Sequence, residues 1–253
     1  MNIQNNNFVV SGAASGLGAA TATALVHAGA RVLLVDLNAA GVAATADALG
    51  MPSAVADITD VAQAQAAIDA GIEAFGSLHG LVNCAGVVLG ERILGRDGPH
   101  GLEAFKRVID VNLIGSFNLL RLAAAAMANN SPDASGSRGV IINTASVAAY
   151  DGQIGQAAYA ASKGAIASLT LPAARELARH GIRVMTIAPG LFETPMMAGM
   201  TDDVRASLAA AVPFPPRLGK PAEYAALALH IITNDMLNGE VIRLDGALRM
   251  AAR

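Results

Sequence analysis

The sequence predicts an α/β fold: a doubly wound parallel sheet of about seven strands with helices on both faces. Two observations lead to this prediction. Short apolar runs alternate with longer helical segments along the whole chain, which is the pattern of βαβ units. The 253 residues also contain no repeat, low-complexity tract or linker, so a single domain over residues 1–253 is expected.

Each expected element has its own signal in the sequence. The strands are the short apolar runs that end near glycine, asparagine or aspartate: residues 8–10, 31–35, 53–56, 80–82, 139–143, 182–187 and 241–244. The helices are the longer, mostly Ala-rich segments between these runs: residues 19–28, 40–49, 61–75, 103–127, 157–180 and 222–232. Residues 61–75 show the helical period most clearly, with Val61, Ala64, Ile68 and Ile72 on one face.

Composition excludes several classes of protein. Hydrophobic residues make up 53% of the chain and charged residues 15%, the opposite of a disordered chain. One cysteine and five scattered histidines offer neither a disulfide framework nor metal-ligand spacing, so no metal is expected. A net charge of −3 indicates no nucleic-acid or anionic-membrane partner. The first residues show no targeting pattern and no uninterrupted apolar run spans a bilayer, so a cytoplasmic location is expected.

A glycine-rich loop follows the first strand. Gly12, Gly16 and Gly18 provide the tight turn and bare backbone that a dinucleotide pyrophosphate needs at a helix start, as in a Rossmann domain. Asp36 ends the second strand, where a carboxylate binds an adenosine ribose and repels a 2′-phosphate. No Arg or Lys occurs at residues 37–41, which favours NAD over NADP. The alternatives are an ordinary tight turn and an aspartate that caps a helix.

Three polar residues suggest a proton-transfer site. Tyr159 and Lys163 lie four residues apart on one expected helix and therefore share a face, and Ser146 follows the strand at 139–143. Oxidation of a secondary alcohol moves a proton at the same oxygen, and a tyrosine does this near neutral pH only if its pKa falls. A nearby ammonium would lower that pKa, and Ser146 would hold the reacting oxygen. Spacing alone leaves open a tyrosine packed on the sheet and a surface lysine.

Motifs along nearly the whole chain resemble the short-chain dehydrogenase/reductase family. The matching residues are Ser11 to Gly18, Asp57, Asn83 to Gly86, Asn112, Ser146, Tyr159, Lys163, Pro189 and Gly190. The resemblance implies that Tyr159 is the general acid/base, with Lys163 lowering its pKa and Asn112 supporting a water-linked relay. Ser146 and Tyr159 would bind the substrate. The cofactor-binding residues implied are Gly12, Ser15, Gly16, Leu17, Gly18, Asp36, Asp57, Ile58, Asn83, Cys84, Ala85, Gly86, Tyr159, Lys163, Pro189, Gly190, Phe192 and Thr194.

Within that family, residues 139–149, 183–192, 212–215 and 238–247 resemble the type II 3-hydroxyacyl-CoA dehydrogenases. This resemblance implies NAD-dependent conversion of an (S)-3-hydroxyacyl-CoA to a 3-oxoacyl-CoA in fatty-acid β-oxidation, by a homotetramer. It also places a substrate loop at about residues 191–218. The alternatives are a hydroxysteroid or other alcohol dehydrogenase and, from another class, a non-catalytic dinucleotide-binding scaffold.

Sulfur-containing residues near the expected site have two interpretations each. Met196, Met197 and Met200 suit a flexible acyl-binding lid in the substrate loop, and the alternative is core packing. Cys84 lies in the expected cofactor groove, where a structural role is favoured over a reactive thiol.

Overall fold

The computed structural model describes residues 1–96, 98–198 and 201–252. The strands are β1 (Asn7–Ser11), β2 (Arg31–Asp36), β3 (Ser53–Val55), β4 (Gly80–Asn83), β5 (Gly139–Thr144), β6 (Ile182–Pro189) and β7 (Val241–Leu244). The helices are α1 (Gly16–His27), α2 (Ala39–Leu49), α3 (Val61–Phe75), α4 (Leu102–Ile109), α5 (Ser116–Met127), α6 (Ala148–Asp151), α7 (Ala157–Leu177), α8 (Pro195–Ala198), α9 (Asp202–Ala210) and α10 (Pro221–Thr233). The seven strands form one parallel sheet in the order β3-β2-β1-β4-β5-β6-β7, which confirms the predicted fold.

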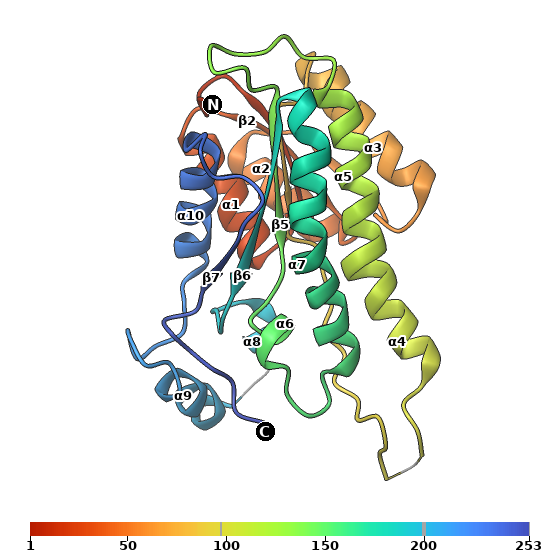
Figure 1. Cartoon of the computed structure of the whole chain (residues 1–253), viewed down its shortest axis with the longest axis vertical. Helices are drawn as coiled ribbons and strands as arrows, with labels where there is room; N and C mark the ends of the chain where they lie inside the picture. The colour runs from red at the N-terminus through yellow and green to blue at the C-terminus, as the bar shows by residue number, and fades with distance from the viewer. Residues whose placement is uncertain (97, 199–200, 253) are drawn as a thin grey trace.

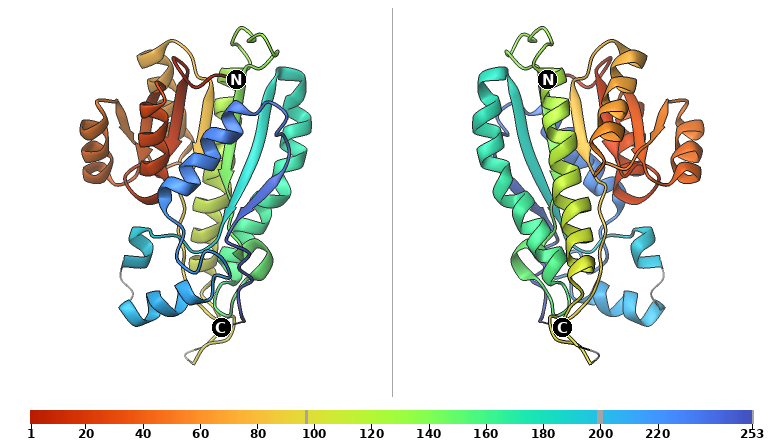
Figure 2. Two further views of the ribbon diagram at one scale, coloured as in Figure 1. Left: turned by 90° about the vertical axis from the view of Figure 1, so that its left-hand side faces the viewer. Right: turned by 90° about the vertical axis from the view of Figure 1, so that its right-hand side faces the viewer.

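Each face of the sheet carries its own apolar core, because successive side chains of a strand point to opposite faces. In β1, Val9 packs with the layer formed by α3, α5 and α7. Its neighbours Phe8 and Val10 pack with the layer formed by α1, α2 and α10. The two helical layers lie on either side of the sheet in Figure 1 and Figure 2. Strands buried on both faces read as continuous apolar runs, and this is why the sequence revealed them.

The expected helix at residues 103–127 contains a change of helical type. It begins as α4, continues as a π-helical segment (Asp110–Gly115) and ends as α5. Such wide turns inside α-helices are frequent at functional sites, and this one contains Asn112. Hydrophobic periodicity does not distinguish an i+5 turn from an i+4 turn over six residues, so the sequence indicated one regular helix. The short helices α6, α8 and α9 were also not predicted.

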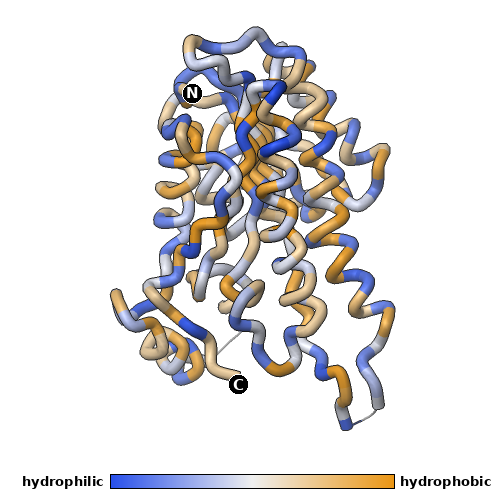
Figure 3. The backbone as a smooth tube through the Cα atoms, in the orientation of Figure 1, coloured by the Kyte–Doolittle hydropathy of each residue, from blue (hydrophilic) through white to orange (hydrophobic). Residues whose placement is uncertain are grey.

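The same stretch, Leu102–Met127, is the one helix of the described residues that is long and apolar enough to cross a membrane by length and composition. More than half of its most apolar window is buried inside the fold. Figure 3 shows hydrophilic and hydrophobic colours alternating along it, as expected for a helix with one face against a core. Core helices satisfy the same length and composition test, so this feature is weak evidence for a membrane span.

The order of the strands creates a crevice at one edge of the sheet. The chain builds outward from β1 to β3 and then returns to β4 on the other side of β1. Ligands of open α/β sheets bind at this reversal, outside the carboxyl ends of the strands. The helices α6, α8 and α9 and the C-terminus gather at the same end of the molecule, at the bottom of Figure 1. The loops that follow β1, β4, β5 and β6 are therefore the segments expected to form a ligand site.

Candidate active site

The loop between β1 and α1 is shaped so that only glycine fits at its critical positions. Gly12 and Gly16 have φ angles of +70° and +56°, a region that side chains with a Cβ rarely adopt. A Cβ on Gly18 would lie 2.1 Å from the carbonyl oxygen of Gly12. Ser15, at the N-terminus of α1, makes no side-chain cap hydrogen bond, so the first N–H groups of this helix remain available to an anion. This bare backbone beside a helix start fits a pyrophosphate.

Asp36, expected at the cofactor site, lies at the end of β2 and is hydrogen-bonded to this loop. Asp36 accepts hydrogen bonds from the backbone N–H groups of Ala14 (3.0 Å) and Asn38 (2.9 Å). Helix α2 is capped by Asn38, whose Oδ1 accepts from Gly41 N at 3.1 Å, so Asp36 is not the cap. Asp36 therefore connects the end of β2 to the glycine loop, where its carboxylate lines the cavity described next.

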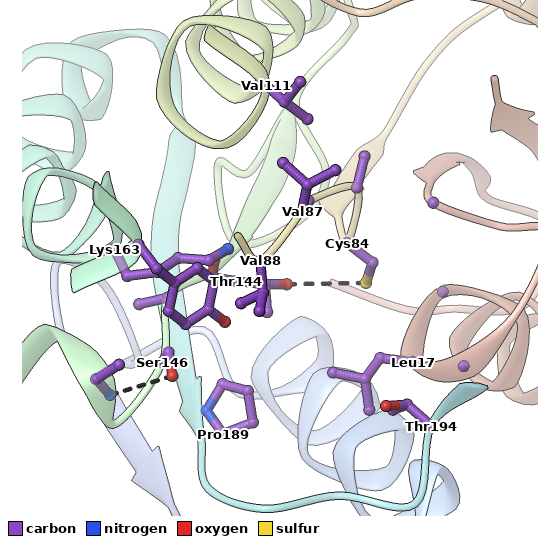
Figure 4. Close-up of a pocket in the computed structure, with 18 of the residues that line it drawn as sticks. Leu17, Cys84, Val87, Val88, Val111, Thr144, Ser146, Lys163, Pro189 and Thr194 are labelled. Atoms are coloured by element: carbon purple, nitrogen blue, oxygen red, sulfur yellow. Dashed lines mark hydrogen bonds between the residues drawn. The ribbon is translucent and has the colours of Figure 1, made fainter. Parts of the chain in front are cut away.

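A cavity of about 1030 Å³ occupies the crevice at the carboxyl edge of the sheet. Drug-sized ligands fill roughly 300–1,000 Å³, so this volume suits a dinucleotide together with part of a substrate. Most of the predicted site residues line it: Gly12, Ser15, Gly16, Leu17, Gly18, Asp36, Asp57, Ile58, Cys84, Ala85, Gly86, Ser146, Tyr159, Lys163, Pro189, Gly190, Phe192 and Thr194. Figure 4 shows Lys163, Thr144 and Ser146 gathered on one side of this pocket and Leu17 and Thr194 across from them.

Asn83 and Asn112, which were expected at the site, are not among the residues that line the cavity. Asn83 is buried between strands, where its Nδ2 donates to Asn143 Oδ1 (2.9 Å) and to the Ser116 carbonyl (3.1 Å). Asn112 is fully buried. Its Oδ1 accepts from Val87 N (2.8 Å), and its Nδ2 donates to the Val87 carbonyl (2.9 Å) and to Ser162 Oγ (3.0 Å). Both amides thus hold the walls of the site in place.

The segment after β4 passes between Asn112 and the predicted catalytic lysine. A Cβ on Gly86 would lie 3.1 Å from Asn112 Oδ1 and 3.5 Å from Lys163 Nζ. This position therefore has room for little more than the hydrogen of a glycine. A larger side chain at this position would press on Asn112, which binds both polar groups of the adjacent Val87 backbone.

Tyr159, Lys163 and Ser146 meet at the substrate side of the cavity. Tyr159 and Lys163 extend from the same face of α7, with Lys163 Nζ 5.8 Å from the centroid of the Tyr159 ring. Lys163 is 4% exposed, and its Nζ donates to the main-chain carbonyl of Thr144 at 2.7 Å. Ser146 follows β5; its Oγ accepts from Ala148 N at 3.1 Å, and the side chain lies close enough to Tyr159 to affect the pKa of the phenol. Three residues separated in the sequence thus surround one point where a substrate oxygen fits.

Burial dominates the electrostatics of this group. It raises the pKa of Tyr159 above the ordinary value of 10.0, and the smaller effect of the Ser146 hydrogen bond only partly opposes it. It also lowers the pKa of Lys163 from 10.5 to about 8. The sequence predicted that the ammonium would lower the tyrosine pKa. In the ligand-free protein, desolvation instead raises the pKa of Tyr159, so Tyr159 is a neutral phenol that can donate a proton.

Cys84 is the only cysteine of the chain, and its surroundings favour the structural interpretation. Burial raises the pKa of its thiol, which therefore stays protonated. Among the described residues, no group of three or more His, Cys, Asp or Glu side chains is placed to hold a metal ion.

Comparison with known proteins agrees with this geometry. The model of the family described as "short chain dehydrogenase" matches residues 6–205. The chain belongs to the short-chain dehydrogenase family. A protein of Bos taurus named 3-hydroxyacyl-CoA dehydrogenase type-2 is 55% identical to it, over 96% of this chain and 94% of that protein.

Two crystal structures are similar to this short-chain dehydrogenase over almost its full length. A 3-hydroxyacyl-CoA dehydrogenase type-2 from Mycobacterium avium superposes with a TM-score of 0.94 at 43% identity, covering 98% of this chain and 97% of that one. A 3-ketoacyl-(acyl-carrier-protein) reductase from Brucella melitensis, complexed with NADH, has a TM-score of 0.87 at 28% identity, covering 98% and 100%. The family membership and the shaped glycine loop together indicate that this chain takes a nicotinamide dinucleotide.

The structure also adds cavity residues of this short-chain dehydrogenase that the sequence did not reveal. They are mostly apolar or amide side chains on the substrate side: Val88, Gln153, Gln156, Leu191, Leu208 and Met250. Met250 reaches the cavity because the C-terminal segment is bound to the loop before α7, where Ile154 N donates to the Ala252 carbonyl at 3.0 Å. Residues without a motif carried no signal for this placement. Met197 of the expected lid lines the cavity, whereas Met200 lies outside the described residues.

Proposed function

We propose that the protein is an NAD-dependent dehydrogenase that converts an (S)-3-hydroxyacyl-CoA to a 3-oxoacyl-CoA, as in fatty-acid β-oxidation. The observation that carries this proposal is the meeting of Ser146, Tyr159 and Lys163 at the edge of a cavity built on a dinucleotide-binding loop. Relatives named 3-hydroxyacyl-CoA dehydrogenase type-2 supply the substrate class, since one of them is 55% identical over nearly the whole chain.

Tyr159, Ser146 and Lys163 have different roles in proton transfer. The bound cofactor would supply the hydride acceptor, or the hydride donor in the reverse direction. Tyr159 exchanges the proton with the substrate oxygen, which Ser146 holds by a hydrogen bond. Lys163 carries a positive charge below a pH of about 8 and favours the phenolate that forms when Tyr159 gives up its proton. In the direction of reduction, the neutral phenol of Tyr159 is the proton donor.

The preference for NAD rests on Asp36. Its carboxylate lines the cavity at the end of β2 and would repel the 2′-phosphate of NADP. Residues 37–41 contain no cation that would compensate this repulsion.

The acyl-CoA assignment is supported by the substrate side of the cavity. Its apolar side chains, Val88, Leu191, Leu208 and Met250, suit an acyl chain better than a sugar. A hydroxysteroid or another apolar alcohol would find the same surface, and this is the second candidate function. Kcat/KM measured for 3-hydroxybutyryl-CoA, longer 3-hydroxyacyl-CoAs, hydroxysteroids and simple alcohols, each with NAD and NADP, separates the two. Folded protein that forms no NADH from any 3-hydroxyacyl-CoA would rule out the first.

Tyr159→Phe tests whether the protein is a catalyst or a dinucleotide-binding scaffold. We expect turnover to fall by about 10²–10⁴-fold, because the proton donor is lost while the ring that packs in the site remains. Cofactor affinity, measured by titration of protein fluorescence or by calorimetry, should stay within a few-fold of the wild-type value. Unchanged turnover would contradict the role of Tyr159, and a wild type that binds NAD but oxidises no alcohol would favour the scaffold.

We also propose that the protein assembles as a homotetramer and acts in the cytoplasm. Support for assembly comes from large apolar side chains on the outer faces of α5, α7 and the π-helical segment: Phe117, Leu171 and Ile114 are 43%, 44% and 47% exposed. Exposed apolar side chains mark a contact between protein chains where they form one contiguous patch, as the proposed assembly requires of these three. Light scattering coupled to gel filtration measures the mass directly, and a monomer would refute the assembly. Cell fractionation tests the location.

A further inference from the structure

A buried tyrosine on the opposite face of the sheet is connected to the catalytic lysine. Tyr224 belongs to α10, which packs with α1 and α2, whereas Lys163 belongs to α7 on the other face. Tyr224 is completely buried and does not line the cavity. Its hydroxyl lies 2.7 Å from Thr144 Oγ1, and the main-chain carbonyl of Thr144 accepts the hydrogen bond from Lys163 Nζ, also at 2.7 Å. Thr144 thus joins the two faces.

The direction of each hydrogen bond in this cluster follows from counting protons. Thr144 Oγ1 lies 2.5 Å from the Asn83 carbonyl, which can only accept, so the one hydroxyl proton of Thr144 goes there. The bond between Thr144 and Tyr224 then requires Tyr224 to donate. Cys84 Sγ lies 3.7 Å from the Tyr224 oxygen and 3.8 Å from Thr144 Oγ1, in contact with both hydroxyls. The result is a one-way series from Tyr224 to Thr144 to the Asn83 carbonyl.

This series holds atoms in place and does not conduct protons. Burial raises the pKa of Tyr224 well above its ordinary value and raises the pKa of the Cys84 thiol, so both stay protonated over the working pH range. A phenylalanine would fill the volume of the Tyr224 ring equally well. The hydroxyl therefore adds the donated hydrogen bond to Thr144 and a longer contact with Cys84 Sγ, and buried hydroxyls of this kind restrict the groups that they bind.

We propose that Tyr224 is a positioning residue: through Thr144, its hydroxyl holds the carbonyl that binds and orients the Lys163 ammonium. The catalytic part of this inference depends on the proposed dehydrogenase function, whereas the link between Tyr224 and Lys163 does not. The titratable groups near Lys163 are Cys84, which interacts with its charge, and Tyr159 on the same helix. Among the described residues no carboxylate pairs with Lys163, so the Thr144 carbonyl is its principal partner for hydrogen bonding.

Loss of the Tyr224 hydroxyl should change the pKa of Lys163 in a defined direction. With Thr144 less restrained, its carbonyl stabilises the charged form of Lys163 less, so the pKa of Lys163 falls further below 8. Lys163 is then positively charged in a smaller fraction of the molecules. With less positive charge nearby, the pKa of Tyr159 rises in the working enzyme. The acid limb of the pH profile of kcat/KM for alcohol oxidation should then move to higher pH, with a drop of at least about threefold in kcat and little change in KM.

The first experiment measures the titration of Lys163 directly and does not depend on enzymatic activity. The chain has three lysines, Lys106, Lys163 and Lys220. NMR titration of protein labelled at lysine Cε therefore follows three signals, which single Lys→Arg variants of the two surface lysines assign. Tyr224→Phe should lower the titration midpoint of Lys163 and leave the other two unchanged. An unshifted Lys163 midpoint in folded Tyr224→Phe protein would overturn the proposal.

Kinetics then test whether Tyr224 acts through Thr144. Thr144→Val should reproduce the shift of the acid limb and Thr144→Ser should restore the wild-type profile, because serine keeps the hydroxyl. Tyr224→Phe added to Thr144→Val should have no further effect, since the partner of the phenol is already absent. Additive effects of the two changes would refute the link. Tyr150→Phe, at a tyrosine that is 51% exposed and outside the cavity, is the matched control and should behave as wild type.

The two experiments also separate this inference from the proposed function. If the wild-type protein oxidises no 3-hydroxyacyl-CoA, the proposed function fails, but the lysine titration still decides whether Tyr224 controls Lys163. If the wild type is active and the Lys163 midpoint does not move in Tyr224→Phe, the inference fails and the function stands.

Discussion

The cost of burying the Lys163 ammonium is large enough to measure as protein stability. The side chain is 4% exposed, and its charge has one hydrogen bond to the Thr144 carbonyl and no carboxylate partner among the described residues. Burial lowers its pKa from 10.5 to about 8. Lys163→Met keeps the length and the apolar stem of the side chain and removes the titrating group. Comparison of the two proteins across pH therefore isolates the effect of the charge.

The expected magnitude follows from the two pKa values. Each pKa unit corresponds to about 1.36 kcal/mol, so the difference of about 2.5 between 10.5 and 8 corresponds to ~3.4 kcal/mol. Between these pH values the unfolded chain holds a proton that the folded chain has released. Stability therefore rises with pH in this window, and the wild type gains about 3 kcal/mol relative to Lys163→Met from about pH 7 to about pH 10.5.

Urea unfolding of the cofactor-free proteins at several pH values measures this difference. Titration of groups that do not interact with Lys163 is common to both proteins and cancels when one free energy of unfolding is subtracted from the other. Lys106→Met is the matched control, because the Lys106 side chain is 55% exposed and its removal should give curves parallel to the wild type. A wild-type minus Lys163→Met difference that stays constant within about 1 kcal/mol would refute the argument that the charge is buried at a cost.

Three further predictions concern binding and specificity. Asp36→Ala should lower the ratio of kcat/KM for NAD to that for NADP at least tenfold, about 1.4 kcal/mol, because the repulsion of the 2′-phosphate is lost; an unchanged ratio would contradict the assigned role. Gly18→Ala should weaken NAD binding, measured by calorimetry, at least tenfold, because the new Cβ would lie 2.1 Å from a backbone oxygen. Gly90→Ala is the control: this position has open space around it, so the variant should bind NAD as the wild type does. Met250→Trp should reduce kcat/KM for long-chain 3-hydroxyacyl-CoAs more than for 3-hydroxybutyryl-CoA because it fills the cavity; equal losses would show that Met250 does not contact the acyl chain.

Local features of the sequence identified most of the fold. The inner strands read as continuous apolar runs because the sheet buries both of their faces, and the glycine loop was visible because backbone conformations such as those of Gly12 and Gly16 favour one residue type. Tyr159 and Lys163 were paired by their spacing on one helix. Each of these signals depends on residues close together in the chain, where geometry follows directly from the local backbone.

The features that the sequence did not predict depend on contacts between segments that are far apart in the chain. The resemblance implied a water-linked relay role for Asn112, which stays a prediction, and only the structure shows that its side chain binds Val87 and Ser162. The sequence also predicted a lowered tyrosine pKa, but the burial of Tyr159, which only the packed tertiary structure sets, raises it.

The sequence by itself determined the sheet, the dinucleotide loop and the identity of the three polar residues that carry the chemistry. Only the tertiary structure brought Met250 from the C-terminus to the cavity and linked Tyr224 to Thr144 across the sheet, 80 residues apart. The physical reason is that desolvation and long-range hydrogen bonds depend on which elements pack together. That packing is determined by the whole sequence acting together. A short local pattern of residues therefore does not reveal it.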